Sequence, residues 1–247
     1  MTPTPKIAVV TGGSRGIGRA CAEALAADGW AVAIGYRSNE ADAKETLEAL
    51  ETADAPGMAV VMDVTDEGSV TEAFRRVTDE LGTVTGLVNN AGMSRDGLLL
   101  KYPTEIYERT MATNMGGAFL CCRAALRGML RARWGRIVNM SSAVALHGNA
   151  GQAVYAATKS GLVGLTKSLA REVGGKGITV NAVCPGFLDT EMTSHLTEEA
   201  RAYYLDQTPI GRAATLAEVS NVVRFLMSEE ASYVNGSVVP VDGGLTA

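Results

Sequence analysis

The sequence predicts one α/β domain in which a mostly parallel, doubly wound sheet of seven strands is covered by helices on both faces. Short apolar, β-branched runs alternate with amphipathic segments along most of the 247 residues, an order typical of βαβ units. The apolar runs are almost continuous in Val, Ile and Ala, as in strands buried on both faces. Because no Pro/Ser-rich linker or abrupt change of composition divides the chain, we assign residues 1–247 to a single domain.

The first half of the chain supplies four predicted strands and the helices between them. Strands are placed where β-branched residues run together, and helices where Ala, Glu and charged residues form an amphipathic pattern. The first helix is expected to end at Gly29, and Asp66 is the expected N-cap of the third helix. The expected order is strand 6–13, helix 16–29, strand 30–36, helix 39–53, strand 57–64, helix 66–82 and strand 86–92.

The second half continues this alternation, with one interruption. The expected order is a long helix near 104–132, strand 135–142, helix 153–173, strand 177–186 and a short final strand at 235–244. The interruption runs from Phe187 to about Thr215 and contains two or so short helical segments. We interpret residues 187–215 as a lid over a site at the end of the sheet.

Composition and charge argue against several classes of protein. Hydrophobic residues make up 47% and charged residues 20%, a globular balance, and the net charge of −5 argues against a broad nucleic-acid surface. The N-terminal residues do not have the pattern of a signal peptide, and no apolar run reaches the roughly 18 residues that span a bilayer. We therefore expect a cytoplasmic protein that binds neither nucleic acid nor membrane.

Cysteine and histidine give little support to a metal site, and we predict none. No C-x-x-C pair is present, so we expect reduced, mostly buried thiols, with a redox role as the alternative. The residues concerned are Cys21, Cys121, Cys122, Cys184, His147 and His195.

A glycine-rich stretch, "TGGSRGIG" at residues 11–18, connects the first strand to the first helix. Gly12, Gly16 and Gly18 permit a tight turn and let backbone N–H groups approach a pyrophosphate at the helix N-terminus. The spacing is G-x-x-x-G-x-G rather than G-x-G-x-x-G, and no G-K-[ST] follows, so a P-loop hydrolase is disfavoured.

The end of the second strand distinguishes between two dinucleotides. An acidic residue about 20 positions beyond the glycines selects NAD, but "IGYRSN" offers Tyr36, Arg37 and Ser38, with no carboxylate before Glu40. Arg37, together with Arg15 of the glycine loop, is suited to hold a 2′-phosphate. We predict NADP(H), the alternative being that both arginines are solvated surface residues.

Tyr155 and Lys159 lie four residues apart on a predicted helix and therefore share one face. A cationic lysine favours the phenolate and lowers the tyrosine pKa. A change from ~10 to ~7 requires about 4 kcal/mol of preferential stabilisation of the charged form. Upstream, Ser141 and Ser142 point to opposite faces if the strand continues, so one of them should face this pair.

The motifs together resemble those of the short-chain dehydrogenase/reductase family. They occur in the family's order over nearly the whole chain: "TGGSRGIG" at 11–18, Asp63, "NNAG" at 89–92, Asn114, Ser142, "YAATK" at 155–159 and "PG" at 185–186. The resemblance implies a Rossmann-type, NAD(P)-binding domain. Within the family, "NAGMSRDGLLLK", "GRIVNMSS", "GNAGQAVYAATKSGLVGLTKSLAREV", "GITVNAVCPGFLDTEMT" and "VNGSVVPVDGG" are most similar to β-ketoacyl-acyl-carrier-protein reductases.

This resemblance implies a catalytic set of Asn114, Ser142, Tyr155 and Lys159. Tyr155 would protonate the developing alkoxide, and Ser142 would orient the same oxygen. Lys159 would lower the tyrosine pKa and bind the nicotinamide ribose, and Asn114 would hold a water in a proton relay. Ser142 is chosen over Ser141 because it lies thirteen residues before the tyrosine, as in the family.

The resemblance also implies a cofactor-binding set that begins at the glycine loop. Asp63 and Val64 would border the adenine, "NNAG" the adenosine ribose, and Pro185, Gly186 and Thr190 the nicotinamide amide. The complete set is Gly12, Ser14, Arg15, Gly16, Ile17, Gly18, Tyr36, Arg37, Ser38, Asp63, Val64, Asn90, Ala91, Gly92, Tyr155, Lys159, Pro185, Gly186 and Thr190. His147 is either structural or in contact with substrate; His195, Glu198 and Glu199 are expected to be solvated.

The predicted reaction is NADPH-dependent reduction of an acyl-carrier-protein-bound 3-oxoacyl thioester in fatty acid biosynthesis. An acetoacetyl-CoA reductase or another NADP(H)-dependent ketone reductase is the alternative. A non-catalytic nucleotide sensor is disfavoured because Ser142, Tyr155 and Lys159 are all present.

The segment "LRGMLRARWGR" at 126–136 carries four arginines in an acidic protein. It is either a solvated helix face or a docking surface for an acidic carrier protein. The resemblance places carrier-docking residues at Arg133 and Lys176, although position 176 is often arginine in the sub-family. It also implies a homotetramer formed through the two long helices.

Overall fold

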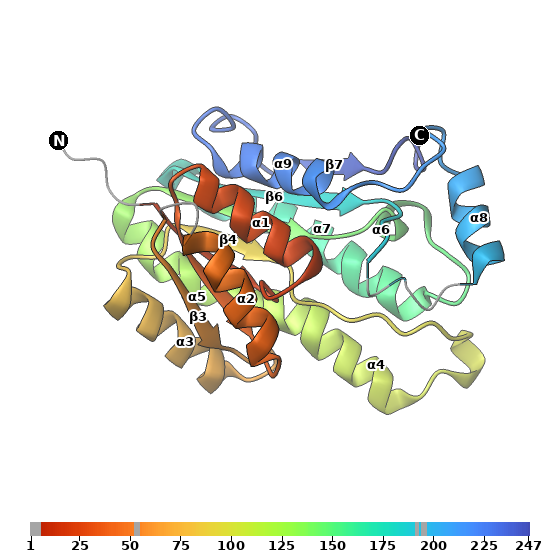
Figure 1. The fold of residues 1–247 in the computed structure, drawn as a ribbon, viewed down its shortest axis with the longest axis horizontal. Helices are drawn as coiled ribbons and strands as arrows, with labels where there is room; N and C mark the ends of the chain where they lie inside the picture. The colour runs from red at the N-terminus through yellow and green to blue at the C-terminus, as the bar shows by residue number, and fades with distance from the viewer. Residues whose placement is uncertain (1–5, 52–54, 191–192, 194–196) are drawn as a thin grey trace.

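The computed structural model describes residues 6–51, 55–190, 193 and 197–247, and in them seven strands form one sheet (Figure 1). The strand order is β3-β2-β1-β4-β5-β6-β7, and every neighbouring pair is parallel, which confirms the predicted doubly wound fold. The strands are β1 Ile7–Thr11, β2 Ala31–Tyr36, β3 Gly57–Val61, β4 Gly86–Asn89, β5 Gly135–Met140, β6 Ile178–Pro185 and β7 Val238–Val241.

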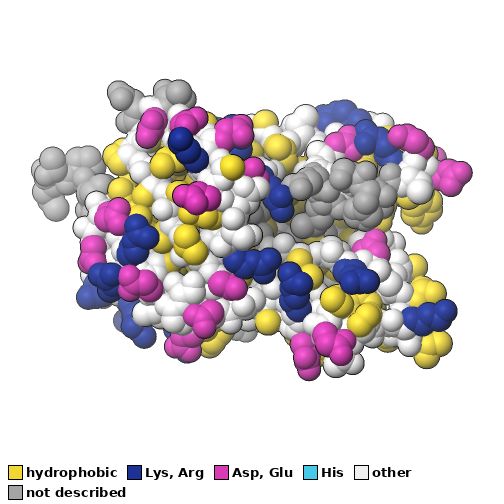
Figure 2. All heavy atoms as spheres, turned by 60° about the horizontal axis from the view of Figure 1, so that its bottom comes forward, with side chains coloured by type: hydrophobic (Ala, Val, Ile, Leu, Met, Phe, Trp, Pro, Cys, Tyr) yellow, Lys and Arg dark blue, Asp and Glu magenta, His cyan; other side chains and the backbone are white. Residues whose placement is uncertain are grey.

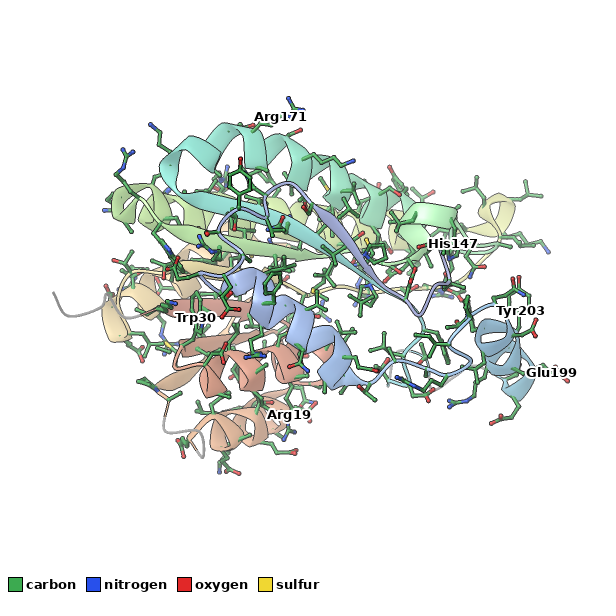
Figure 3. The ribbon with its side chains drawn as sticks, turned by 90° about the horizontal axis from the view of Figure 1, so that it is seen from above. Arg19, Trp30, His147, Arg171, Glu199 and Tyr203 are labelled. Atoms are coloured by element: carbon green, nitrogen blue, oxygen red, sulfur yellow. The ribbon has the colours of Figure 1, made fainter. Side chains whose placement is uncertain are left out.

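Helices cover both faces of this sheet. The principal helices are α1 Gly16–Ala27, α2 Glu40–Glu51, α3 Glu67–Glu80, α4 Thr104–Met111, α5 Gly117–Ala132, α6 Val144–His147, α7 Ala153–Val173, α8 Glu198–Asp206 and α9 Leu216–Met227. One apolar core lies between the strands and α3, α5 and α7, and a second lies between the strands and α1, α2 and α9. Figure 3 shows the two layers, with α7 above the sheet and α1 and α9 below it.

The topology fixes where a ligand can bind. The chain leaves β1 towards β2 on one side, whereas β4 lies on the other side of β1, so the direction of winding reverses between β1 and β4. In such sheets the crevice for a ligand opens at the carboxyl ends of the strands beside this reversal. The glycine loop follows β1 and "NNAG" begins in β4, so both motifs lie at this edge.

Three details of the predicted elements differ from the structure. The helix expected near 104–132 is divided by a π-helical turn, Ala112–Gly116, between α4 and α5. Helix α9 was not predicted, although Thr215 and Glu218 form a capping box at its start. The predicted strands are longer than the observed ones because their last residues turn away from the sheet and carry the functional side chains. The second helix is confirmed to Glu51; residues 52–53 of that prediction lie outside the described residues.

The segment predicted as a lid leaves the sheet and returns to its own starting point. Leu188 forms a parallel bridge with Ala214, and the Ala214 N–H donates to the Phe187 carbonyl oxygen at 2.9 Å. Between these ends, α8 lies at the edge of the molecule beside the C-terminus (Figure 1). Residues 191–192 and 194–196, which include His195, lie outside the described residues. Its action as a lid stays a prediction.

The structure also shows where the cysteines and the charged side chains lie. All four cysteines are free and buried. Figure 2 shows Lys and Arg side chains mixed with Asp and Glu over the visible face, without one large basic patch. Within the described part of the chain, no helix is long and apolar enough to cross a membrane, and no group of three or more His, Cys, Asp or Glu could hold a metal ion.

Candidate active site

A cavity of about 460 Å³ opens at the carboxyl ends of β5 and β6. Ser142 follows β5, Tyr155 lies in the first turn of α7, and Pro185 and Gly186 lie at the end of β6; all four residues line the cavity. Ile17 of the glycine loop lines it too, so the loop and the cavity are parts of one site.

The two serines after β5 have different environments, as strand alternation predicts. Ser141 is buried, and its Oγ donates to the Lys159 backbone carbonyl at 2.8 Å. Ser142 is half-buried; its hydroxyl is hydrogen-bonded to that of Tyr155, and its Oγ accepts from the Val144 N–H at 3.2 Å. Both serines line the cavity, but only Ser142 interacts with the Tyr155 hydroxyl, because the Ser141 hydroxyl is engaged by the backbone of α7.

Tyr155 and Lys159 lie on one face of α7, as predicted. The Lys159 Nζ is 5.6 Å from the centroid of the Tyr155 ring and donates to the Met140 carbonyl oxygen at 2.7 Å. The predicted lowering of the tyrosine pKa is wrong for the protein alone: burial raises the pKa of Tyr155 to about 12, against a smaller opposing effect of the Ser142 hydrogen bond. Burial also lowers the pKa of Lys159 to about 8.

These two pKa shifts have the same physical cause and suit a proton donor. Desolvation disfavours a charge on either group, so at neutral pH the phenol retains its proton. A protonated tyrosine is the form required to donate a proton to an oxygen that gains negative charge. The ammonium group of Lys159 remains mostly charged at pH 7 and can stabilise the phenolate left after that transfer.

Asn114 lies in the π-helical turn and is buried. Its Nδ2 donates to the Met93 carbonyl oxygen at 2.9 Å and to the Thr158 Oγ1 at 3.0 Å, and its Oδ1 accepts from the Met93 N–H at 2.8 Å. The side chain thus fixes the loop after β4 to α7, one residue before Lys159. The predicted water relay through Asn114 stays a prediction.

Packing explains the glycines of the loop after β1. A Cβ on Gly18 would lie 2.1 Å from the Gly12 carbonyl oxygen and 2.5 Å from the Asn90 Nδ2. Gly12 and Gly16 have φ values of +60° and +54°, which favour glycine. A Cβ on Gly16 would meet no atom of the described residues within 4 Å, so the backbone there is open to a ligand.

"NNAG" supports the glycine loop through hydrogen bonds. The Asn90 Nδ2 donates to the carbonyl oxygens of Thr11 and Gly12, both at 3.1 Å. The Thr11 Oγ1 accepts from the N–H groups of Asn90 at 3.0 Å and Ala91 at 2.9 Å. These contacts hold the glycine loop in place beside the start of α1, where a pyrophosphate is predicted to bind. Ser14 is buried, and its carbonyl oxygen accepts from the Thr46 Oγ1 of α2.

The opposite end of the predicted cofactor site lies beyond β2 and β3. Tyr36 is half-buried, whereas Arg37, Ser38 and Arg15 are exposed. Hydrogen bonds from Thr65 are the main cause of a lowered pKa at Asp63, with smaller contributions from the charges of Arg37 and Arg109. Val64 is buried against Gly117 of α5. Arg37 therefore lies close enough to Asp63 for its charge to act on that carboxylate.

The predicted nicotinamide end is well packed. A Cβ on Gly186 would lie 2.7 Å from the Asp242 Cα, so only glycine fits between β6 and the segment after β7. Thr190 lines the cavity, and its N–H donates to the Thr193 Oγ1 at 3.0 Å. Gly92 is exposed beside Lys159 and Asn114: a Cβ there would lie 3.5 Å from the Lys159 Nζ and 3.4 Å from the Asn114 Oδ1.

Of the other predicted residues, His147 lies at the cavity and the rest lie apart from it. Arg133 and Lys176 are exposed at the amino-terminal side of β5 and β6, the opposite edge of the sheet. His147 is exposed and lines the cavity, and Glu198 and Glu199 are exposed in the first turn of α8.

Sequence reasoning assigned no role to several cavity residues. Asp96, Gln152, Phe187 and Tyr204 all line the cavity but were not predicted as site residues. The stretch "GNAGQ" was noted as a sub-family feature, and it contains Gln152. The contacts of Asp96 and Tyr204 could not be recognised because their partners are distant in sequence.

Comparisons with known proteins found relatives that match the chain over nearly its whole length. A family model described as enoyl-(acyl carrier protein) reductase matches residues 12–246. The chain is 45% identical over 240 residues to the 3-oxoacyl-(acyl-carrier-protein) reductase FabG of Pseudomonas aeruginosa and to that of Escherichia coli, covering 97% of each chain in both cases. It is 44% identical over 240 residues to the reductase of the same name from Aquifex aeolicus, again covering 97% of both chains.

The fold, the site and these relatives together define the class of protein as a dinucleotide-dependent oxidoreductase. The chain belongs to the short-chain dehydrogenase/reductase family, as the sequence motifs predicted. Membership implies a nicotinamide dinucleotide as cofactor.

Proposed function

We propose that the protein is an NADPH-dependent reductase of 3-oxoacyl thioesters on acyl carrier protein, acting in fatty acid biosynthesis. The observation that carries this proposal is the full-length similarity to reductases of that name, combined with Ser142 and Tyr155 in one cavity beside Lys159. The product is the 3-hydroxyacyl thioester.

The proposed chemistry divides between the cofactor and three side chains. When bound, the reduced nicotinamide supplies a hydride to the carbonyl carbon. Ser142 donates a hydrogen bond to the carbonyl oxygen and orients it towards Tyr155. Tyr155 donates its proton to that oxygen as the C=O bond becomes C–O–H. Lys159 stabilises the resulting phenolate, which regains a proton from solvent, and Asn114 keeps α7 and the loop after β4 in place.

The glycine loop, Asn90, Asp63 and Arg37 form the proposed cofactor site. The backbone around Gly12 and Gly16 would hold the pyrophosphate, and Pro185, Gly186 and Thr190 would border the nicotinamide. Exposed Arg37 and Arg15 would pair with a 2′-phosphate, since the end of β2 offers no carboxylate that would select the ribose of NAD.

A kinetic comparison of cofactors and thioesters tests this function. NADPH and NADH would be oxidised separately with acetoacetyl thioesters of carrier protein and of CoA. We expect NADPH with the carrier-bound substrate to give the highest kcat/KM. Arg37→Ala should reduce the preference for NADPH over NADH by about tenfold, since it removes a charge-assisted hydrogen bond. Preference for CoA would redirect the proposal to acetoacetyl-CoA reduction, and preference for NADH would contradict the role of the arginines.

We also propose a cytoplasmic homotetramer formed through α5 and α7. Four free, buried cysteines are consistent with a reducing compartment.

The six residues of β5 separate Arg133 from Ser142 by roughly 20 Å along the strand, so these residues lie at opposite edges of one subunit. A twofold axis that pairs the long helices antiparallel would bring Arg133 and Lys176 close to the cavity of a neighbouring subunit. Light scattering that detects only a monomer would contradict this assembly.

Charge reversal at Arg133 tests carrier docking. Arg133→Glu is expected to lower kcat/KM for the carrier-bound thioester roughly tenfold at low salt, because it opposes the steering of an acidic partner. The same variant should keep its activity with the CoA thioester, which serves as the internal control. An equal effect on both substrates, or no effect on either, would assign Arg133 to the solvated helix face instead.

A further inference from the structure

A chain of hydrogen bonds connects three residues of the cavity wall, Asp96, Gln152 and Tyr204, which come from segments far apart in sequence. The Gln152 Nε2 donates to the Asp96 Oδ1 at 2.9 Å, and the Asn149 Nδ2 donates to the Gln152 Oε1 at 3.0 Å. The Asn149 Nδ2 also donates to the Tyr204 Oη at 2.8 Å. The loop after β4, the start of α7 and helix α8 are thereby connected through Asn149 and Gln152.

Tyr204 is held on its other side by an aromatic contact. Its ring stacks on Phe187 with a centroid distance of 5.2 Å and an interplanar angle of 5°. Phe187 follows β6, so this contact connects α8 to the same sheet edge that carries Gly186. The Tyr204 ring and hydroxyl are therefore both engaged, and Tyr204 forms a fixed part of the cavity wall.

Asn149 also lies close in sequence to the proposed catalytic tyrosine. Gln152 is the N-cap of α7, its N–H donates to the Asn149 carbonyl oxygen at 3.1 Å, and Tyr155 is three residues further on. A second contact supports the same loop: the Gly97 N–H donates to the Gly151 carbonyl oxygen at 2.8 Å. Movement of α8 away from the cavity would therefore strain the turn from which the helix bearing Tyr155 begins.

From this geometry we propose that Asn149 and Tyr204 are positioning residues that hold α8 as a wall of the cavity and so determine how well the acyl thioester is bound. This inference rests on the proposed function. The two residues act as one unit, because the hydrogen bond between them is lost when either partner is changed. The KM for the dinucleotide should change less than that for the thioester, since its proposed phosphate and adenosine contacts lie beyond β1, β2 and β3, away from α8.

A double-mutant cycle tests the unit. Asn149→Ala and Tyr204→Phe each remove the hydrogen bond between the two residues; Asn149→Ala also removes the contact with Gln152, and Tyr204→Phe retains the ring that stacks on Phe187. We expect Tyr204→Phe to raise the KM for the 3-oxoacyl thioester by about three- to tenfold, in keeping with one lost hydrogen bond, and Asn149→Ala to raise it at least as much, with kcat and the KM for NADPH changed less than twofold. The double variant should match Asn149→Ala. Tyr203→Phe, at the exposed neighbour on the same helix, should behave as wild type.

Hydrogen exchange of the α8 amides supplies a readout that does not depend on the reaction. Exchange over residues 198–206 should accelerate about three- to tenfold in Asn149→Ala and Tyr204→Phe, and remain unchanged in Tyr203→Phe. Multiplicative effects in the double variant, unchanged exchange, or faster exchange with an unchanged thioester KM would each overturn the proposal. If wild-type protein reduces no thioester, the proposed function fails, and exchange alone then decides whether Asn149 holds α8.

Discussion

Replacing Tyr155 with phenylalanine is expected to lower kcat for thioester reduction by about 10³-fold, the range for loss of a positioned proton donor. The variant retains the ring and loses only the hydroxyl, which is hydrogen-bonded to Ser142 in the cavity. NADPH affinity should change much less than kcat, because Tyr155 is only one of the predicted cofactor contacts and the phosphate contacts are made by the glycine loop. Rapid mixing of the NADPH complex with substrate would measure the chemical step, and a cofactor titration would measure binding.

The control for Tyr155→Phe is the same substitution at an exposed tyrosine. Tyr233→Phe makes the same chemical change at a side chain that is 99% exposed, and it should leave kcat unchanged. If Tyr155→Phe retained kcat within tenfold of wild type, another group would have to donate the proton, and the proposed mechanism would fail. A large loss of cofactor affinity would instead assign Tyr155 a structural role in the dinucleotide site.

The second large effect is expected at Gly16. Gly16→Ala should raise the Kd for NADPH on the order of 10²-fold, because the added methyl group would occupy the open space through which a pyrophosphate approaches the backbone. Alanine is strained at a φ of +54°, so the substitution should also lower the free energy of unfolding by about 1 kcal/mol. Isothermal titration with NADPH measures the first effect, and chemical denaturation measures the second.

Gly29 supplies an internal control at the other end of α1. Its φ is +78°, and a Cβ there would likewise meet no atom of the described residues within 4 Å. Gly29→Ala should therefore lose a similar amount of stability while binding NADPH as wild type does. Equal Kd changes in the two variants would show that strain in α1, rather than the space beside Gly16, governs cofactor binding.

Local patterns in the sequence were sufficient to predict the fold and the central cluster. Alternating apolar and amphipathic segments predicted the parallel sheet, and the four-residue spacing of Tyr155 and Lys159 predicted their shared helix face. Alternation along β5 separated Ser141 from Ser142. These inferences succeeded because each depends on residues that are neighbours along one strand or helix.

Features set by tertiary contacts were not predicted. Spacing gave the proximity of Lys159 to Tyr155, but not the burial that raises the tyrosine pKa or the Met140 carbonyl that binds the ammonium group. The π-helical turn leaves no clear mark on the hydrophobic period, yet it places Asn114 against α7. Asn149 and Tyr204 are 55 positions apart, and no local pattern pairs them.

The four buried cysteines can serve as native probes of local opening of the fold. Burial raises the pKa of Cys21 and of Cys122 to about 12, and it also raises those of Cys121 and Cys184. The thiolate is the reactive form, and a buried thiol with a raised pKa is neither ionised nor accessible. An alkylating reagent can therefore react with each cysteine only when the surrounding structure opens. Cys21 lies in α1, Cys121 and Cys122 lie in α5 on the other face, and Cys184 lies in β6, next to Pro185 of the cavity wall. Alkylation rates resolved by mass spectrometry would thus time the opening of each layer separately, with no engineered label.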